Sequence, residues 1–198
     1  LPVLLDAPMM SWGIASRFER RATALHPTRS AILGMVCAAL GAAKGSSLES
    51  DWLTLLATVR LTVFAIPRTP AGSPWPTPIR RLEDFHTVSG TRTAENKLRQ
   101  DAVISRRQYL LDARFAAILE GPRGVLQPVA DALRNPRWGI WFGRKCCIPA
   151  APVLRSDSPV NTLDEAMARL GLADRSLERF TVVTEVSDFA DGTDTLPD

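Results

Sequence analysis

The sequence predicts an α+β domain in which two helices pack on one face of a four-stranded sheet. Three observations favour this class. Of the 198 residues, 45% are hydrophobic, which is enough for a packed core. Strand-like and helix-like patterns follow one another in the order β, α, β, β, α, β. Between the second and third strands lies a polar and basic stretch without a sustained period, which is typical of an insertion.

The first half of this order occupies the first third of the chain. PVLLDAP predicts a short first strand, and residues 26–41 predict a helix that Thr28 caps and Gly41 ends. SLESDWLTLLA predicts a second helix with serine caps. The alternation in TVRLTVFAIP predicts the next strand, which Pro67 ends. The expected apolar face of the second helix consists of Leu48, Trp52, Leu55 and Leu56.

The second half of the order follows the insertion, which spans residues 80–107 and is expected to form an extended hairpin. YLLDARFAAILEG predicts the third strand, and PRGVLQPVADALRNP predicts a helix. WGIWFGRK predicts a short aromatic strand, with Trp138, Trp141 and Phe142 in the core. This order of elements is that of a ferredoxin-like, RRM-type domain.

We place a domain boundary near residue 150. Residues 1–150 form the predicted RRM-like domain, and residues 151–198 form a small, acidic C-terminal subdomain or tail with one helical stretch and one strand. Up to Arg155 the chain carries 21 basic and 11 acidic residues, whereas the remainder carries 3 and 10. A basic body of this kind predicts an anionic partner.

Composition also limits the function classes. The sequence shows no run of 18 apolar residues and no secretory pattern, so we expect a cytoplasmic protein without a membrane segment. With two histidines, no cofactor loop and no ligand spacing, we expect neither a metal nor a cofactor. Cys37, Cys146 and Cys147 have no zinc or disulfide spacing and are expected in the core.

Arg29 stands in an unfavourable place. It lies in the first turn of the helix that Thr28 caps, where the helix dipole presents partial positive charge. Two explanations are open. Arg29 is solvated at a small cost, or it shares an anion such as a phosphate with the helix terminus.

Three stretches combine aromatic rings with arginines, as RNA-binding surfaces do. SWGIASRFERR places Trp12 among arginines, and SRRQYL places two arginines beside Tyr109. In NPRWGIWFGRKCC, Gly143 removes a side chain where a backbone amide could approach a phosphate. The sequence therefore favours an RNA-binding protein.

Two other functions stay open. A metal-independent endoribonuclease needs only a base near the 2′-hydroxyl and an acid near the leaving oxygen, and His86, Tyr109 and Lys145 are the available groups. A protein-interaction module would instead use the basic face to bind an acidic partner.

Six motifs resemble, in order and spacing, the CasD subunits of type I-E Cascade, the CRISPR-associated RNA-guided surveillance complex; these subunits are part of the RAMP superfamily. The motifs are APMMSWG, PTRSAILGMVCAALG, DFHTV, SRRQYLLDARF, NPRWGIWFGRK and CCIPAAPVL. The resemblance implies a non-catalytic subunit that grips the 5′ handle of the CRISPR RNA and caps the backbone of an antiviral complex. The insertion would be a thumb that contacts a neighbouring backbone subunit.

The resemblance also implies partners and a site. The implied partners are the CRISPR RNA, the backbone subunit CasC, the large subunit CasA and, through the complex, target DNA. On this hypothesis an RNA phosphate neutralises Arg29, and Arg29→Ala weakens RNA binding without loss of thermal stability. The residues expected to bind RNA are Ser11, Trp12, Gly13, Arg17, Arg20, Thr28, Arg29, Ser30, His86, Arg106, Arg107, Tyr109, Gly143, Arg144 and Lys145.

Overall fold

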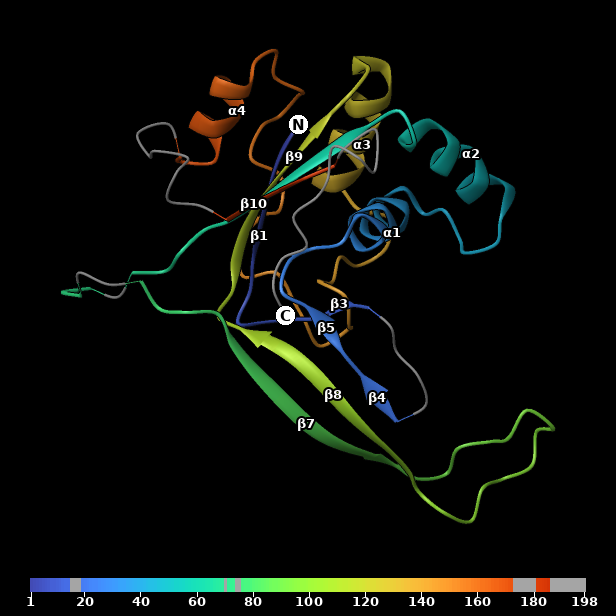
Figure 1. Ribbon diagram of the computed structural model, residues 1–198. Helices are drawn as coiled ribbons and strands as arrows, with labels where there is room; N and C mark the ends of the chain where they lie inside the picture. The colour runs from blue at the N-terminus through green and yellow to red at the C-terminus, as the bar shows by residue number, and fades with distance from the viewer. Residues whose placement is uncertain (15–18, 70, 74–75, 173–180, 186–198) are drawn as a thin grey trace.

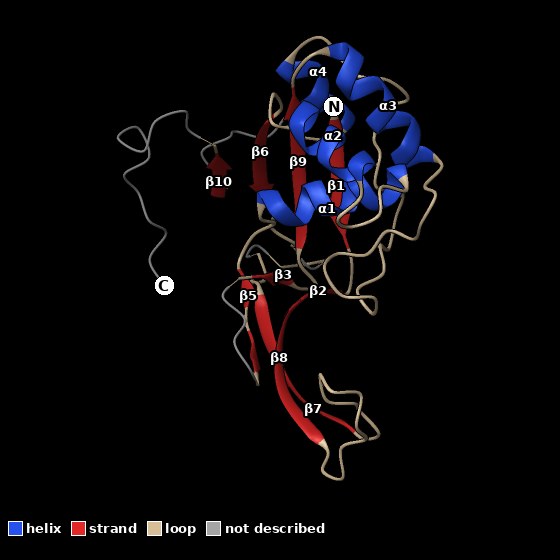
Figure 2. Ribbon diagram, turned by 90° about the vertical axis from the view of Figure 1, so that its right-hand side faces the viewer, coloured by secondary structure: helices blue, strands red, loops and turns tan. Residues whose placement is uncertain are grey.

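The computed structural model describes residues 1–14, 19–69, 71–73, 76–172 and 181–185. In this part of the chain, helices surround one β-sheet to form a body (Figure 1). A long hairpin of a second sheet projects away from the body (Figure 2). The predicted α+β class is therefore confirmed. None of the described helices is long and apolar enough to cross a bilayer.

The body sheet has four strands among the described residues, in the order β1-β9-β6-β10, and every neighbouring pair is antiparallel. β9 lies in the middle and is buried from its second residue to its sixth. Both of its faces are therefore covered, which explains its continuous apolar run. The bounds are Pro2–Asp6 for β1, Arg60–Ala65 for β6, Arg114–Glu120 for β9 and Thr181–Thr184 for β10.

Three helices lie on one face of the body sheet, to its right in Figure 1: α1 (Arg29–Leu40), α2 (Ser47–Leu56) and α3 (Arg123–Arg134). Both predicted caps of α1 are confirmed, because the Thr28 hydroxyl accepts from the Ala31 N–H and Gly41 has a φ of 73°. The predicted apolar face of α2 is wrong in part. Leu48 and Leu55 stay exposed, since α2 contacts the body mainly at its end.

The opposite face of the body sheet is covered by α4 (Leu163–Arg169), on the left in Figure 1. Met167 and Leu170 pack there on Leu4, Phe64 and Ile118. The predicted arrangement of one sheet and one helix layer is therefore incomplete, because α4 adds a third layer.

The predicted aromatic strand at residues 138–145 is wrong. The backbone forms turns there, because the Phe142 carbonyl accepts from the Ser11 N–H at 3.0 Å and the Phe142 N–H donates to the Cys147 carbonyl at 2.9 Å. Phe142 and Cys147 are buried, whereas Cys146 is exposed. Trp138 and Trp141 were also predicted in the core and are instead partly exposed.

The edge of β1 is covered by the segment after these turns. The Leu4 N–H donates to the Val153 carbonyl at 2.8 Å, and the Arg155 N–H donates to the Pro2 carbonyl at 3.2 Å. At the opposite edge of the sheet, β10 pairs with β6. The described part of residues 151–198 thus packs against the body on both sides.

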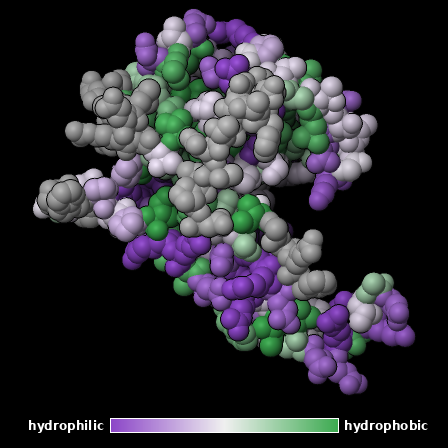
Figure 3. Space-filling view, viewed as in Figure 1, coloured by the Kyte–Doolittle hydropathy of each residue, from purple (hydrophilic) through white to green (hydrophobic). Residues whose placement is uncertain are grey.

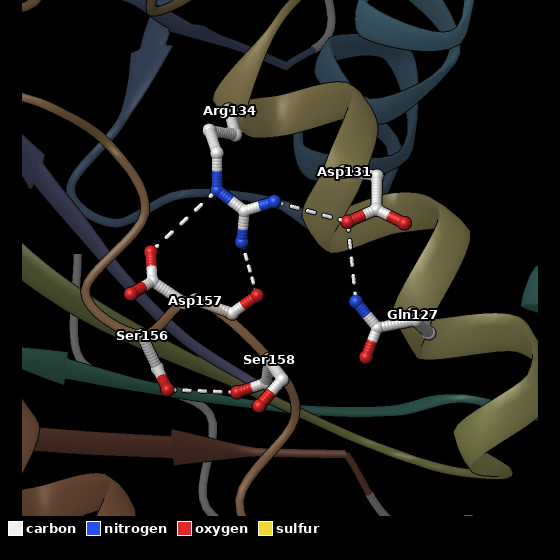
Figure 4. Close-up of polar contacts among 6 residues, drawn as sticks. All are labelled: Gln127, Asp131, Arg134, Ser156, Asp157 and Ser158. Atoms are coloured by element: carbon white, nitrogen blue, oxygen red, sulfur yellow. Dashed lines mark hydrogen bonds and ion pairs between the residues drawn. The ribbon is translucent and has the colours of Figure 1, made fainter.

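Arg134, at the end of α3, binds the segment of the chain that leads to α4 (Figure 4). Its guanidinium donates to the backbone carbonyl of Asp157 and, at 3.0 Å, to the carboxylate of Asp131. The Gln127 amide donates to the same carboxylate at 3.1 Å. A cation in the last turn also complements the dipole of α3.

The predicted insertion forms a hairpin of β7 (Arg80–Val88) and β8 (Val103–Leu111), with nine registered pairs. The hairpin extends four residues beyond the predicted end, because β8 continues into the body. Two short strands pair with β8: β2 (Met9–Met10) is antiparallel to it, and β4 (Arg20–Arg21) is parallel to it. Nearby, β3 (Trp12–Gly13) pairs with β5 (Thr23–Ala24).

A kink at Asp112 divides the predicted third strand between β8 and β9. Asp112 has a φ of 52°, and its N–H donates to the Pro8 carbonyl at 2.9 Å. Its carbonyl accepts from Arg68 Nε at 2.6 Å, and its carboxylate pairs with Arg80 at 2.5 Å. These contacts set the direction in which the hairpin leaves the body.

We expect substitutions of Asp112 to change stability mainly through the positive φ at this position and only slightly through the exposed ion pair with Arg80. Asp112→Asn tolerates the positive φ and loses only the exposed pair with Arg80, so it costs less than about 0.5 kcal/mol. Asp112→Val places a β-branched residue there and costs about 1–2 kcal/mol. Urea unfolding measures both variants, and equal losses would contradict this prediction.

Candidate functional site

A pocket of 330 Å³ lies between the base of the hairpin sheet and the start of α1. Residues from the N-terminal part of the chain and from a distant turn at residues 143–144 form its wall. Among the described residues, six of the predicted RNA-binding residues line it together, and Arg21 and Ala31 complete it. The lining residues are Ser11, Gly13, Arg21, Thr28, Ser30, Ala31, Gly143 and Arg144.

Gly143 is required by a close contact with Ser11. Gly143 has a φ of 97°, and a Cβ built on it would collide with the Ser11 carbonyl. The amide expected to approach a phosphate is already used, because it donates to the Trp141 carbonyl at 3.0 Å. The predicted reason for this glycine is therefore wrong. Its role is to let the turn approach the buried Ser11.

Arg144, which lines the pocket, connects the turn after Phe142 with β8 and β4. Its Nη1 donates to the Gln108 carbonyl of β8 at 2.9 Å, and its Nη2 donates to the Arg21 carbonyl of β4 at 3.0 Å. Its guanidinium also lies over the Tyr109 ring, 4.5 Å from the centroid. Arg144 thus holds the turn, β8 and β4 in place around the pocket.

The start of α1 supplies donors on the remaining side. The Thr28 hydroxyl caps the helix, and the Ser30 hydroxyl lies 3.3 Å from it. The first turn of α1 has no acidic residue. First-turn N–H groups carry the positive end of the helix dipole, so this side of the pocket favours an anion.

Arg29 belongs to the same helix start, but its guanidinium is bound elsewhere. It donates to the carbonyls of Leu56 and Val59 at 2.9 Å each and pairs with Glu185 at 2.5 Å. The first two acceptors lie at and just after the end of α2, where the dipole is negative. The hypothesis that a phosphate explains this arginine is therefore wrong, because an internal carboxylate neutralises it.

Four arginines of the described chain face one another where β4 pairs with β8. Arg20 lies opposite Arg106, and Arg21 lies opposite Arg107. Like charges at such positions repel. Arg106 has Glu83 at 3.6 Å, whereas the guanidinium groups of Arg20 and Arg21 make no hydrogen bond or ion pair with the described residues. Figure 3 shows hydrophilic residues gathered over this part of the hairpin, and the four arginines favour an anion.

Two residues expected to bind RNA, Trp12 and Tyr109, have buried rings. Trp12 is 1% exposed and packs on Phe115 and Phe142, with centroids 6.5 and 5.8 Å away. Tyr109 is buried under Arg144, and burial raises the pKa of its hydroxyl. The expectation that these two rings present themselves to RNA is wrong, because both belong to the core.

His86 and Tyr109, two of the groups considered for a ribonuclease, are not brought together. His86 is paired in register with Ser105, four residues along β8 from Tyr109, which corresponds to about 13 Å. The His86 ring lies 3.7 Å from the Asp84 carboxylate. Lys145 is exposed, 6.0 Å from the Trp141 ring centroid.

One predicted site residue and one further residue need separate mention. Arg17 lies outside the described residues. Arg21 was not among the predicted site residues, although it belongs to the basic stretch SWGIASRFERR. The signal for Arg21 in the sequence is therefore this basic stretch as a whole. Its parallel pairing with β8, which brings Arg21 beside Arg107, is a long-range contact that no local pattern encodes.

The pocket, the arginine pairs and the projecting hairpin define an α+β protein with a cationic surface beside a pocket. A protein family matches nearly the whole chain: the model described as CRISPR-associated protein (Cas_Cas5) covers residues 1–196. The chain therefore belongs to this family of CRISPR-associated proteins.

Individual relatives agree with this assignment. The CRISPR system Cascade subunit CasD of Escherichia coli (strain K12) is 30% identical over 149 residues, which is 72% of this chain and 64% of CasD. A chain of a CRISPR RNA-guided surveillance complex superposes with a TM-score of 0.66 at 30% identity, covering 81% of this chain and 64% of that one. A Cas protein crystal structure gives 0.57 at 30% identity, covering 84% and 68%. The chain spans just under two thirds of the length of CasD.

Gly143→Ala is expected to destabilise the protein. The variant must place a Cβ at a positive φ and against the Ser11 carbonyl, which costs about 1–3 kcal/mol. Gly13→Ala is the matched control, since it changes another glycine of the pocket and its Cβ meets no heavy atom within 4 Å. Urea unfolding compares them, and an unaltered Gly143→Ala midpoint would refute the close contact.

Tyr109 is expected to ionise above its ordinary pKa of 10, because burial disfavours the phenolate. It is the single tyrosine of the chain, so the ultraviolet absorbance of tyrosinate reports it alone. Since its pKa is raised in the folded state, its contribution to stability is complete below pH 10 and falls as the pH rises through the folded pKa. A titration midpoint that is the same in folded and urea-unfolded protein would contradict the burial.

Proposed function

We propose that this chain is a non-catalytic RNA-binding subunit of a type I-E Cascade complex, which grips the 5′ handle of the guide RNA and caps the backbone. The observation that carries the proposal is the pocket, in which a helix start, two hydroxyls and two arginines meet beside the paired arginines of β4 and β8. Membership in the CRISPR-associated family and the likeness to CasD support it.

The proposed binding mode follows from the donors of the site. One RNA phosphate binds in the pocket, where Thr28, Ser30 and the start of α1 donate to its oxygens. Arg21 and Arg107 bind the next phosphates along the strand, since guanidinium groups make forked contacts with phosphate oxygens. The volume of 330 Å³ is large enough for one phosphate group of the strand.

The partners follow from the same proposal. The β7-β8 hairpin acts as the thumb that contacts the backbone subunit CasC. CasA is a second neighbour, and target DNA is reached through the complex, which works in the cytoplasm. We also propose that the antiparallel order β1-β9-β6, with helices on one face, is a ferredoxin-like core whose fourth strand is replaced by residues 150–155.

A non-catalytic role is supported by the separation of the groups that could cut RNA. Tyr109 is buried with a raised pKa, and His86 lies about 13 Å further along the hairpin. These positions favour RNA binding over the alternative of a metal-independent endoribonuclease. The third possibility, an acidic protein partner, is distinguished from RNA by the dependence of binding on salt.

Arg21→Ala is expected to weaken binding of the full chain to a repeat-derived RNA about tenfold and to make the salt dependence shallower, since one phosphate contact is lost. Arg60→Ala removes the same charge from an exposed residue of β6 and should leave affinity unchanged. Fluorescence anisotropy over a range of salt measures both variants.

Arg29→Ala is a second control in this experiment. It removes internal contacts, so it costs about 1–2 kcal/mol of stability and leaves RNA affinity intact below the unfolding temperature. The proposal is refuted if the wild-type chain binds repeat-derived RNA no better than scrambled RNA. It is also refuted if Arg21→Ala and Arg60→Ala behave alike.

A further inference from the structure

The face of the hairpin opposite the pocket carries an aromatic ring in line with two cations. Residues paired across strands point to the same face, so Phe85, Arg106 and Arg20 form one row across β7, β8 and β4. We call these three residues the outer row. Arg21 and Arg107, each one residue further along, point to the other face, on which Arg21 lines the pocket.

The ring of the outer row is accessible. Phe85 is 63% exposed, although it lies in the middle of a strand with pairs on either side. A phenylalanine at this degree of exposure contributes little to the core, which contains neither Phe85 nor its β8 partner. Its apolar face is available to a flat ligand.

The cations of the outer row lack full compensation. Arg20 and Arg106 sit on neighbouring strands, about 4.8 Å apart, where like charges repel. Glu83 lies 3.6 Å from Arg106 in an exposed pair, and the guanidinium of Arg20 has no acidic partner among the described residues. An anion that bridges the two arginines would relieve this repulsion.

We propose that the outer row binds an unpaired nucleotide of a nucleic-acid strand. The base stacks on Phe85, and the neighbouring phosphates bind Arg106 and Arg20. A ring next to cations is the arrangement by which proteins hold single strands without reading their sequence. An acidic peptide would use the two arginines but would leave the exposed ring without a role.

The geometry of the outer row is fixed before a ligand binds. Nine registered pairs hold β7 on β8, and the contacts of Asp112 hold the base of the hairpin. Backbone pairing thus sets the spacing of the ring and the cations. Little conformational entropy is therefore lost on binding. The strand is either the guide RNA or target DNA, and this part of the inference rests on the proposed function.

The test measures binding of short single-stranded RNA and DNA to the full chain. Phe85→Ala is expected to weaken binding of one of them about tenfold, since this is the usual loss when a stacked ring is removed. Leu98→Ala is the matched control, because Leu98 is 66% exposed in the loop of the same hairpin. Thermal unfolding checks that neither exposed substitution alters the fold.

A second measurement isolates the stacked base. Abasic nucleotides are placed one at a time along the strand, and one position is expected to weaken binding to wild type about tenfold. In Phe85→Ala the same abasic position should have no further effect, because the ring and the base act as a pair. A response with RNA identifies the guide, and a response with DNA identifies the target strand.

The inference is overturned if Phe85→Ala binds both strands as wild type does, or if it weakens binding of polyglutamate and not of nucleic acid. Failure of the proposed function gives a different result. Insensitivity of RNA binding to Arg21→Ala would contradict the pocket, whereas insensitivity to Phe85→Ala would contradict the outer row alone.

Discussion

The contact between Gly143 and the Ser11 carbonyl holds the candidate site together. It brings the turn after Phe142 against the chain that leads into β3, and the Gln108 carbonyl of β8 accepts from both the Ser11 hydroxyl and Arg144. Because these segments are far apart in the sequence, the pocket forms only when the whole domain folds. A polar group as buried as Ser11 must be hydrogen-bonded, so the junction has little freedom to rearrange.

Arg29 shows how a charge that looks misplaced in the sequence becomes structural. A cation is unfavourable at the start of α1, but the same side chain reaches the carbonyls of Leu56 and Val59. Glu185 accepts from Arg29 and also from the Leu61 N–H, so it joins the C-terminal strand to β6 and α1. The Arg29 side chain thus bridges the start of α1 and the end of α2, and Glu185 neutralises its charge. The donors left at the start of α1 stay available on the pocket side.

Local patterns predicted α1 and its caps because hydrophobic period and capping residues act within a few residues. They were wrong at residues 138–145, where alternating aromatic residues resemble a strand but Phe142 bonds to Ser11 and Cys147. They also assigned Trp12 and Tyr109 to RNA, because a ring beside arginines looks alike whether it is buried or exposed. Six pocket residues were nevertheless expected, because the resemblance to the CasD subunits rests on the motifs that contain them, while the pairing of β4 with β8 that adds Arg21 is non-local.

The placement of α4 explains why the proposed nucleic-acid contacts lie on the hairpin sheet. RRM domains stack bases on the open face of their sheet, but here Leu4, Phe64 and Ile118 occupy that face beneath α4. The hairpin sheet carries an arginine pair on each face, so along β4 it has no apolar face that would fix its strand register. That register must be set at its base, where Asp112 turns β8 into β9 and Arg144 fastens β4 and β8 to the turn. The same contacts that shape the pocket therefore also align the cations that lie beyond it.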